Sequence, residues 1–271
     1  MTARIHDTYR PASERVRDYL PVEPMIETAS LREQAKRCMN CGIPFCCGSG
    51  CTLANVIPEF NAAVMQGRDR LAWEILSSTS AMPEFTAWLC PALCEGSCTC
   101  GIGDEPVMIR QVEKYIVETA FENGWVTPGT PNVRNDRSVA VVGSGPAGLV
   151  VADILNRAGF TVKVYERNSQ PGGLLRYGIP DFKLAKPLVE RRVALMREAG
   201  VEFILDMDVG LDVSAEYLKK HNDAVVMAVG TPLARDLPAP GRELGGIHFA
   251  LEFLQGMNRT VGNEISAPPI S

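Results

Sequence analysis

The sequence lacks long apolar runs and an excess of positive charge. Its uninterrupted apolar runs, such as residues 139–142 and 224–229, are far shorter than the roughly 20 residues of a membrane-spanning helix. The 27 Lys and Arg residues are outnumbered by 32 Asp and Glu residues, which argues against nucleic acid as the main partner. Residues 1–10 contain no apolar core of the kind found in secretory signals, so we expect a cytoplasmic protein without a membrane partner.

Histidine is scarce, and cysteine is absent from more than half of the chain. The three histidines, His6, His221 and His248, are scattered, and we expect them at the surface or in loops. All nine cysteines fall between Cys38 and Cys100. An odd number of clustered thiols, with no export signal before them, predicts metal binding rather than a disulfide framework.

The chain divides by composition at residues 127–136, which are rich in Pro, Gly, Thr and Asn. We expect a helical domain over residues 1–130 and an α/β domain over residues 131–271. The first half has helical spacing at residues 30–37, 57–66, 70–77 and 107–123, with Pro106 in the first turn of the last helix and Gly124 after its end. Glycines and prolines around the cysteines predict irregular loops there.

The cysteine spacing predicts tetrathiolate sites. Cys38 and Cys41 form a C-x2-C pair, and the remaining thiols are Cys46, Cys47, Cys51, Cys90, Cys94, Cys98 and Cys100. Zinc and iron–sulfur clusters both accept four thiolates, so spacing alone leaves both possible. The Cys90-Pro91 pair, together with the flavin signals described below, favours iron–sulfur clusters. Cys47 and Cys100 are the expected spare thiols.

The second half opens with a dinucleotide-binding pattern. A strand at residues 138–142 runs into a G-x-G-x-x-G turn and then a helix through Ala158. The next strand, residues 161–165, ends at Glu166, whose carboxylate suits ribose hydroxyls. The turn glycines are Gly143, Gly145 and Gly148; they provide in order a tight turn, close approach to a pyrophosphate, and close packing of helix on strand.

Residues 171–180 (PGGLLRYGIP) follow, and their paired glycines and compact apolar stretch suit a large flat ring system such as a flavin. We then expect a helix at residues 186–200 and strands at 202–205 and 224–229. The last strand ends at Gly230-Thr231, where the backbone approaches the same cofactor. The predicted fold of this half is a Rossmann-like FAD-binding domain.

Four motifs together resemble the small, or β, subunit family of NADPH-dependent glutamate synthase. They are CMNCGIPFCCGSGCTLANVIPE, CPALCEGSC, VVGSGPAGL and GGLLRYGIPDFKL. The resemblance extends from about Arg32 to the end of the chain. Related N-terminal modules occur in dihydropyrimidine dehydrogenase and in bifurcating NADPH–ferredoxin oxidoreductases.

The resemblance implies an N-terminal α-helical ferredoxin-like domain with two [4Fe-4S] clusters. It assigns Cys38, Cys41, Cys46 and Cys98 to the first cluster, and Cys51, Cys90, Cys94 and Glu113 to the second. One extra residue separates Cys46 from Cys51 relative to the common family pattern, so the choice between Cys46 and Cys47 stays open. For FAD it implies Gly143, Ser144, Gly145, Pro146, Ala147, Gly148, Glu166, Arg167, Gly173, Leu174, Arg176, Ile179, Pro180, Gly230 and Thr231.

The resemblance also implies an electron-transfer role and no catalytic acid or base in this chain. Electrons from NAD(P)H would pass through FAD and the clusters to a large glutamate synthase subunit. No second G-x-G-x-x-G occurs, so we expect NADPH to bind a missing or separate domain. Two alternatives remain at this point: a subunit of a related ferredoxin or sulfide-type oxidoreductase, and a non-redox zinc-binding adaptor.

Overall fold

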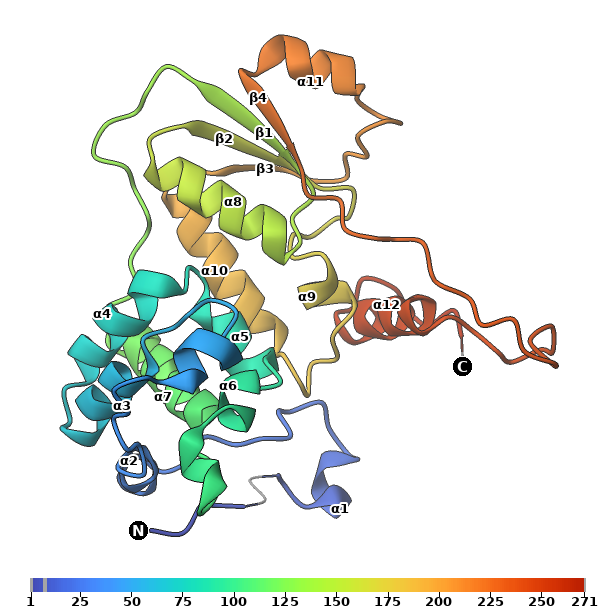
Figure 1. The fold of residues 1–271 in the computed structure, drawn as a ribbon. Coiled ribbons are helices and arrows are strands. Elements are labelled where there is room, and N and C mark those ends of the chain that lie inside the picture. Colours follow the sequence, from blue (N-terminus) through green and yellow to red (C-terminus); the bar gives the residue numbers. More distant parts are fainter. Residues whose placement is uncertain (1, 7–8, 271) are drawn as a thin grey trace. The chain divides into compact units, whose positions relative to one another are not determined.

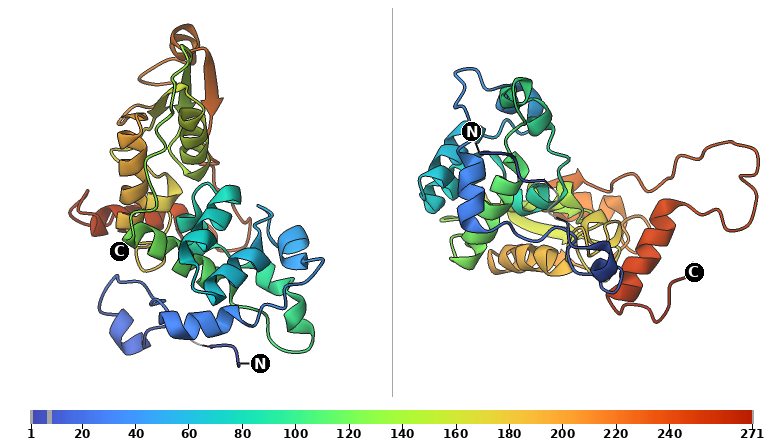
Figure 2. Two further views of the ribbon diagram at one scale, coloured as in Figure 1. Left: turned by 90° about the vertical axis from the view of Figure 1, so that its left-hand side faces the viewer. Right: turned by 90° about the horizontal axis from the view of Figure 1, so that it is seen from below.

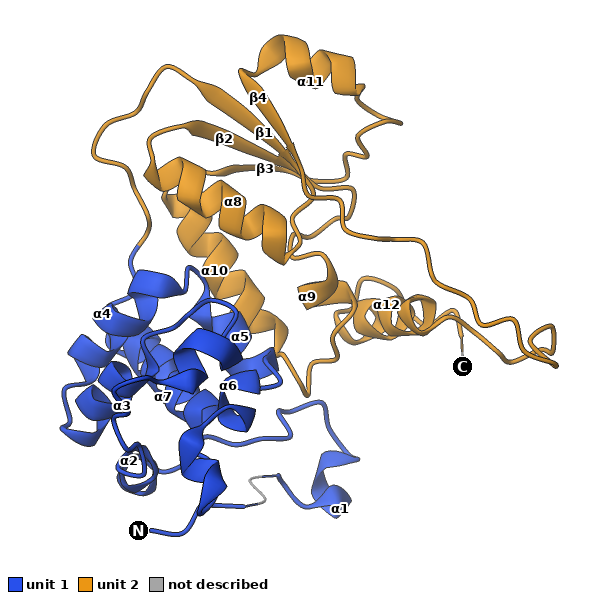
Figure 3. Cartoon of the chain, in the orientation of Figure 1, with its two compact units in different colours: residues 1–127 blue, residues 128–271 orange. Residues whose placement is uncertain are grey.

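The computed structural model describes residues 2–6 and 9–270, which form two compact units. Unit 1 comprises residues 1–127 and unit 2 comprises residues 128–271 (Figure 3). Within the described residues, none of the helices combines the length and the apolar character that a bilayer crossing requires. The predicted cluster ligands lie in unit 1, and the predicted flavin-binding residues lie in unit 2.

Every regular element in the described part of unit 1 is helical (Figure 1). The α-helices are α1 (Ala12–Arg15), α2 (Thr28–Ala35), α3 (Ile57–Met65), α4 (Asp69–Thr79), α5 (Pro83–Leu89), α6 (Leu93–Gly96) and α7 (Ile109–Glu122). A π-helical turn, η1 (Cys46–Gly50), and a 3-10 turn, η2 (Thr99–Ile102), lie within the cysteine-bearing segments.

Helix α7 is the centre of unit 1, where it contacts α2, α3, α4, α5 and α6. Its residues Val112, Ile116 and Ala120 recur at helical spacing and are fully buried. Phe60 of α3 and Leu76 of α4 belong to the same apolar core. Seven cysteines belong to this core or pack against it, so apolar burial and the thiol-bearing loops are parts of one packing unit.

Unit 2 is built on a four-stranded parallel sheet in the order β3-β2-β1-β4. The strands are β1 (Ser138–Val142), β2 (Thr161–Tyr165), β3 (Glu202–Ile204) and β4 (Ala224–Met227), and the helices are α8 (Pro146–Arg157), α9 (Leu174–Tyr177), α10 (Lys186–Glu198), α11 (Ala215–His221) and α12 (Ala250–Val261). Strand β1 lies between β2 and β4, and the chain crosses over at this central strand. A parallel sheet places the turns that follow its strands at one edge, where dinucleotides bind.

Helices cover both faces of this sheet. Helix α8 packs on β1 and β2, and α10 lies on the same side, whereas α11 covers the other face (Figures 1 and 2). On the α11 face, Leu218 packs with Ala140, Val142 and Tyr165. Burial on both faces explains why β1 reads as a continuous apolar run rather than an alternating one.

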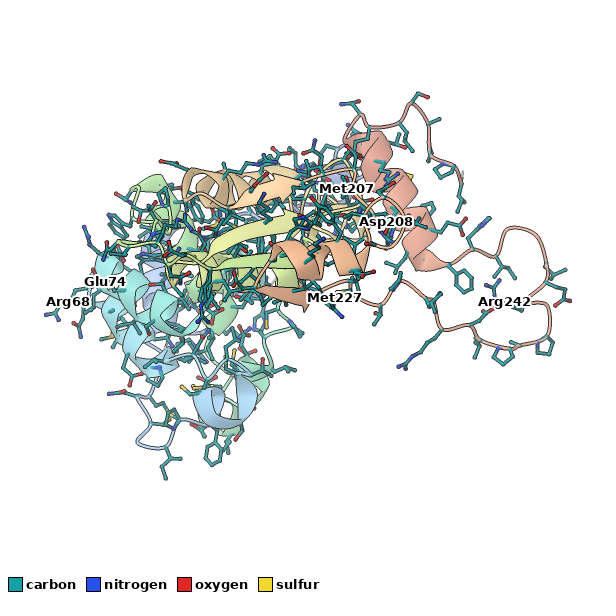
Figure 4. The ribbon with its side chains drawn as sticks, turned by 90° about the horizontal axis from the view of Figure 1, so that it is seen from above. Arg68, Glu74, Met207, Asp208, Met227 and Arg242 are labelled. Atoms are coloured by element: carbon teal, nitrogen blue, oxygen red, sulfur yellow. The ribbon has the colours of Figure 1, made fainter. Side chains whose placement is uncertain are left out.

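The connection from β4 to α12 leaves the sheet as a long loop (Figure 4, where Arg242 is labelled). Met227, also labelled, ends β4 with 62% of its surface exposed. Within the loop, Arg242 Nε donates to Asp236 Oδ1 at 2.6 Å, and its guanidinium lies 4.8 Å from the ring centre of Phe249. Arg242 thus links Asp236 and Phe249 within this connection.

Two predicted details of unit 1 are wrong. Helix α7 begins at Ile109 with Met108 as its N-cap, so Pro106 lies before the helix rather than in its first turn. The segments around the cysteines are not wholly irregular, since they contain η1, α6 and η2. The reason is that short turns satisfy backbone groups locally even where Gly and Pro are frequent.

Candidate functional site

The first group of thiols converges on one cavity in unit 1. Cys38 follows α2, Cys41 lies in the next loop, Cys46 begins η1, and Cys98 follows α6. All four of these cysteines line the cavity, although Cys98 is 57 residues beyond Cys41 in the sequence. The other lining residues are Met39, Pro44, Phe45, Pro58, Thr99, Cys100 and Val107. The structure therefore brings together the four side chains expected around the first cluster.

The π-helical turn explains the extra residue between Cys46 and Cys51. The backbone N–H of Cys51 donates to the carbonyl oxygen of Cys46 at 2.8 Å, which is the i to i+5 bond of a π-helix. Cys46 lines the cavity, whereas Cys47 does not, and their sulfur atoms are 3.9 Å apart. The turn thus accommodates the additional residue while presenting Cys46 to the cavity.

Gly50, at the end of η1, lets the two cysteine segments approach each other. A Cβ atom at Gly50 would lie 2.6 Å from the Cα atom of Cys94 and 3.0 Å from the Cβ atom of Ser97. Such distances are too short for any side chain. Only glycine therefore permits η1 to pack directly on the backbone of α6, which carries Cys94 and leads into Cys98.

A second group of titratable side chains lies near Cys94. Burial raises the pKa of the Cys94 thiol, and the next largest effects come from the charges of Glu113, Glu95, Cys51 and Cys90. These side chains therefore lie close enough to interact with it. The group contains all four ligands expected for the second cluster, together with Glu95.

Glu113 is held in place by a buried polar chain. Asn55 Nδ2 donates to Glu113 Oε1 at 3.2 Å, and Thr79 Oγ1 donates to Asn55 Oδ1 at 2.9 Å. Glu113 and Asn55 are only 6% and 2% exposed. Burial raises the pKa of Glu113 to about 7, and the Asn55 hydrogen bond opposes that effect. Asn55 is a site residue that the cysteine spacing gives no means of finding.

The thiols of the first group resist deprotonation. Burial raises the pKa of Cys38, and burial followed by the charge of Cys47 raises the pKa of Cys46 to about 12. Metal binding at such thiols therefore releases protons. Among residues 2–6 and 9–270, no three His, Cys, Asp or Glu side chains are arranged to hold a single metal ion. The four thiols that line one cavity are the set of donors that an iron–sulfur cluster takes.

In unit 2, the turn from β1 to α8 has the geometry of a phosphate-binding loop. Gly143 has φ +99°, and a Cβ atom there would lie 2.4 Å from the carbonyl oxygen of Ala228. A Cβ atom at Gly148 would lie 1.9 Å from the carbonyl oxygen of Gly143. Gly145 is the N-cap of α8, with Pro146 and Ala147 in the first turn, and nothing lies within 4 Å of its Cβ position. Open space in front of a helix N-terminus suits a pyrophosphate.

Glu166 links this turn to the loop after β2. Its Oε2 accepts hydrogen bonds from the backbone N–H and the hydroxyl of Ser144, and its Oε1 accepts two from Asn168. These four bonds use all the acceptor positions of a carboxylate. A ribose hydroxyl at Glu166 therefore has to replace one of these donors, of which the Ser144 hydroxyl is the most easily rotated.

The paired glycines pack against the same turn. Gly173 has φ +51°, and a Cβ atom there would lie 2.7 Å from the Cα atom of Gly145. The N–H of Gly172 donates to Ser144 Oγ at 2.9 Å. The segment that follows the glycines is thereby fixed beside the start of α8.

The remaining residues expected at FAD differ in exposure. Arg176 is buried, where its Nε donates to the carbonyl oxygen of Pro171 at 3.2 Å and its guanidinium pairs with Glu190 at 3.0 Å. Leu174 is 47% exposed. Of the others, Ile179 and Pro180 are half-buried, and Arg167, Gly230 and Thr231 are exposed. Gly230 and Thr231 follow β4, next to the carbonyl of Ala228 that contacts the Gly143 turn.

Comparisons with known proteins agree with this two-part architecture. Residues 15–125 match the family model described as dihydropyrimidine dehydrogenase domain II, 4Fe-4S cluster. Residues 141–184 match the model of an NAD(P)-binding Rossmann-like domain. An iron–sulfur domain is therefore followed by a Rossmann-like domain.

Curated relatives match nearly the whole chain. The small chain of NADPH-dependent glutamate synthase from Mycobacterium tuberculosis is 51% identical over 97% of this chain and 54% of its own length. The corresponding small chain from Bacillus subtilis is 47% identical over 85% of this chain and 48% of its own length. NADH-dependent glutamate synthase from Saccharomyces cerevisiae is 45% identical over 96% of this chain and 12% of its own length. The chain thus spans about half the length of the small chains it matches.

Proposed function

The chain belongs by sequence to the family of glutamate synthase small chains, and from that premise we propose that it is an electron-transfer module carrying two [4Fe-4S] clusters and FAD. The observation that carries the proposal is the convergence of Cys38, Cys41, Cys46 and Cys98 on one cavity. In this proposal, the cavity lined by these cysteines is the site for an iron–sulfur cluster, and the turn between β1 and α8 is the site for a flavin nucleotide. When bound, the flavin accepts electron pairs and the clusters carry single electrons.

In unit 1, the residues of this chain act as ligands and as a shield from water. Cys38, Cys41, Cys46 and Cys98 hold the first cluster. The second cluster is held by Cys51, Cys90, Cys94 and Glu113. Asn55, which donates to Glu113 Oε1, would fix the orientation of this carboxylate as a ligand, as hydrogen-bonded partners of metal ligands commonly do.

In unit 2, backbone groups bind the flavin nucleotide. The start of α8, with Gly145, Pro146 and Ala147, faces the pyrophosphate. Glu166 and Ser144 bind the ribose, with Arg167 at its edge. The ring system lies against the segment that contains Gly173, Leu174, Arg176, Ile179 and Pro180, and Gly230 and Thr231 close the site.

The partner in this proposal is a large glutamate synthase subunit, which receives the electrons for reductive glutamate formation. NADPH is the electron source and binds a part of the enzyme outside this chain. The function is thus the delivery of reducing equivalents, and this chain contributes no acid or base to glutamate chemistry.

Anaerobic purification and reconstitution of the full chain test the cofactor proposal. We expect about eight iron and eight sulfide atoms and one FAD per chain, and electron paramagnetic resonance signals on reduction. Tightly bound zinc without sulfide would instead support the adaptor alternative. Co-purification with a large glutamate synthase subunit tests the partner, and exclusive capture of a ferredoxin would contradict it.

A further inference from the structure

Asn61 is a fully buried polar residue in an apolar part of unit 1. It lies on α3, where Ile57, Phe60 and Val64 form part of the core, and its own exposure is 0%. Neither its amide nitrogen Nδ2 nor its amide oxygen Oδ1 has a hydrogen-bond partner in the described structure. A buried amide without partners destabilises a fold, so its presence calls for a binding role.

The position of Asn61 on α3 directs it toward the first group of thiols. Pro58, three residues earlier and on the same side of the helix, lines the cavity together with Cys38 and Cys98. Cys38 follows α2, and α2 packs on α3. The buried Asn61 amide therefore lies on the side of α3 that carries the cavity-lining Pro58, next to the first group of thiols.

Resting on the cluster proposed above, we infer that Asn61 is a positioning residue whose Nδ2 donates a hydrogen bond to the Cys38 sulfur or to a neighbouring sulfide of the first cluster. Such a bond satisfies the unpaired donor. It also strengthens when the cluster accepts one electron, because negative charge on the sulfur atoms then increases. Asn61 thus raises the reduction potential of the first cluster relative to a chain without this donor.

The Asn61→Leu variant tests the inference, since leucine has a similar shape and no donor. We expect the one-electron equilibrium of the first cluster to shift about tenfold toward the oxidised form, which corresponds to 59 mV. Redox titration of the reconstituted full chain, followed by electron paramagnetic resonance, measures this shift. The first-cluster signal is assigned by its change in a Cys38→Ser variant, and the second cluster is the internal control.

A second variant, Asn61→Ser, keeps a donor and serves if the leucine variant does not fold. We expect the first-cluster potential of Asn61→Ser to lie close to that of the original chain. The potential of Asn61→Asp should lie further away, because this variant places a negative charge beside the cluster. Equal first-cluster potentials in all variants, or equal shifts of both clusters, would overturn the inference. An original chain that binds no iron and sulfide would instead overturn the proposed function itself.

Discussion

The side-chain nitrogen of Asn55 donates a hydrogen bond to the carboxylate of Glu113 at 3.2 Å. The two residues are 58 positions apart, on the segment before α3 and on α7. Because Glu113 is buried, this bond decides which way its carboxylate points. The carboxylate that we propose as a ligand of the second cluster thus depends on a neighbour for its orientation.

We predict that Asn55→Leu weakens iron binding at the second cluster by about 10- to 100-fold, the usual effect of losing a partner of a metal ligand. Competition with an iron chelator, monitored through the electron paramagnetic resonance of each cluster, measures this. The matched control is Thr79→Val, which removes the bonds of the Thr79 hydroxyl to Asn55 Oδ1 and to the Leu76 carbonyl oxygen. It leaves the bond between Asn55 and Glu113 in place and should have a smaller effect. Equal retention of both clusters in Asn55→Leu contradicts the orienting role of Asn55.

Cys46 and Cys47 form a matched pair for ligand assignment. We predict that Cys46→Ser lowers the iron content from about eight to about four atoms per chain, because the first cluster loses a thiolate. Cys47→Ser should keep about eight, since Cys47 lies outside the cavity. Iron and sulfide analysis after identical reconstitution checks both values. The reverse pattern would identify Cys47 as the ligand.

Gly50 and Gly48 differ in the space available to them, although both lie in η1. Gly50→Ala places a Cβ atom 2.6 Å from Cys94 Cα, so we predict a loss of about 1–3 kcal/mol in the free energy of unfolding. Nothing lies within 4 Å of the Cβ position of Gly48, and Gly48→Ala should change stability by less than about 0.5 kcal/mol. Urea unfolding of the iron-free chains compares them, and equal losses would argue against the close packing of η1 on α6.

Substitutions at Gly145 and Gly148 should distinguish an effect on flavin binding from an effect on folding. Gly145→Ala should leave the stability of unit 2 nearly unchanged, because the added Cβ atom enters open space. The same Cβ atom occupies the phosphate side of the turn, so FAD binding should weaken about tenfold or more. Gly148→Ala should destabilise unit 2 by about 3 kcal/mol, since its Cβ would lie 1.9 Å from the Gly143 carbonyl oxygen. Thermal unfolding and FAD titration measure the two effects. If Gly145→Ala binds FAD as tightly as the original chain, the pyrophosphate does not bind at the start of α8.

The regular elements near the glycine turn follow closely from the sequence. Strands β1 and β2 have the bounds expected, and α8 ends one residue before the expected position. Their pattern is local, since a β-branched apolar run, a glycine turn and an amphipathic helix follow one another directly. Local patterns of this kind need no knowledge of distant contacts.

Other elements could not be predicted from the sequence. Helix α12 runs without a break through Gly256, whose Cβ position lies 2.5 Å from Pro269 Cδ, so a helix-weakening residue lets the chain pack closely there. Helix α5 begins at Pro83 in a stretch without a clear cap. In both cases tertiary packing outweighs local preference.

The polar partners of the candidate sites were also missed. The positions of Asn55 and Asn61 relative to the cysteines and Glu113 depend on the packing of α3 on α2 and α7, and no spacing rule links these two residues to the cysteines. Asn61 did carry one signal, because it is a polar residue on an otherwise apolar helical face. The cluster and flavin ligands themselves remain predictions, although the structure gathers the four first-group cysteines around one cavity.

The π-helical turn at Cys46–Gly50 bears on how such proteins are detected from sequence. The hydrogen bond from Cys51 to Cys46 spans five residues instead of four. The turn therefore accommodates an inserted residue without changing the orientation of the cysteines at its two ends. Searches that demand a single fixed interval between these cysteines would overlook chains of this type. A search template that tolerates one additional position there would recover them.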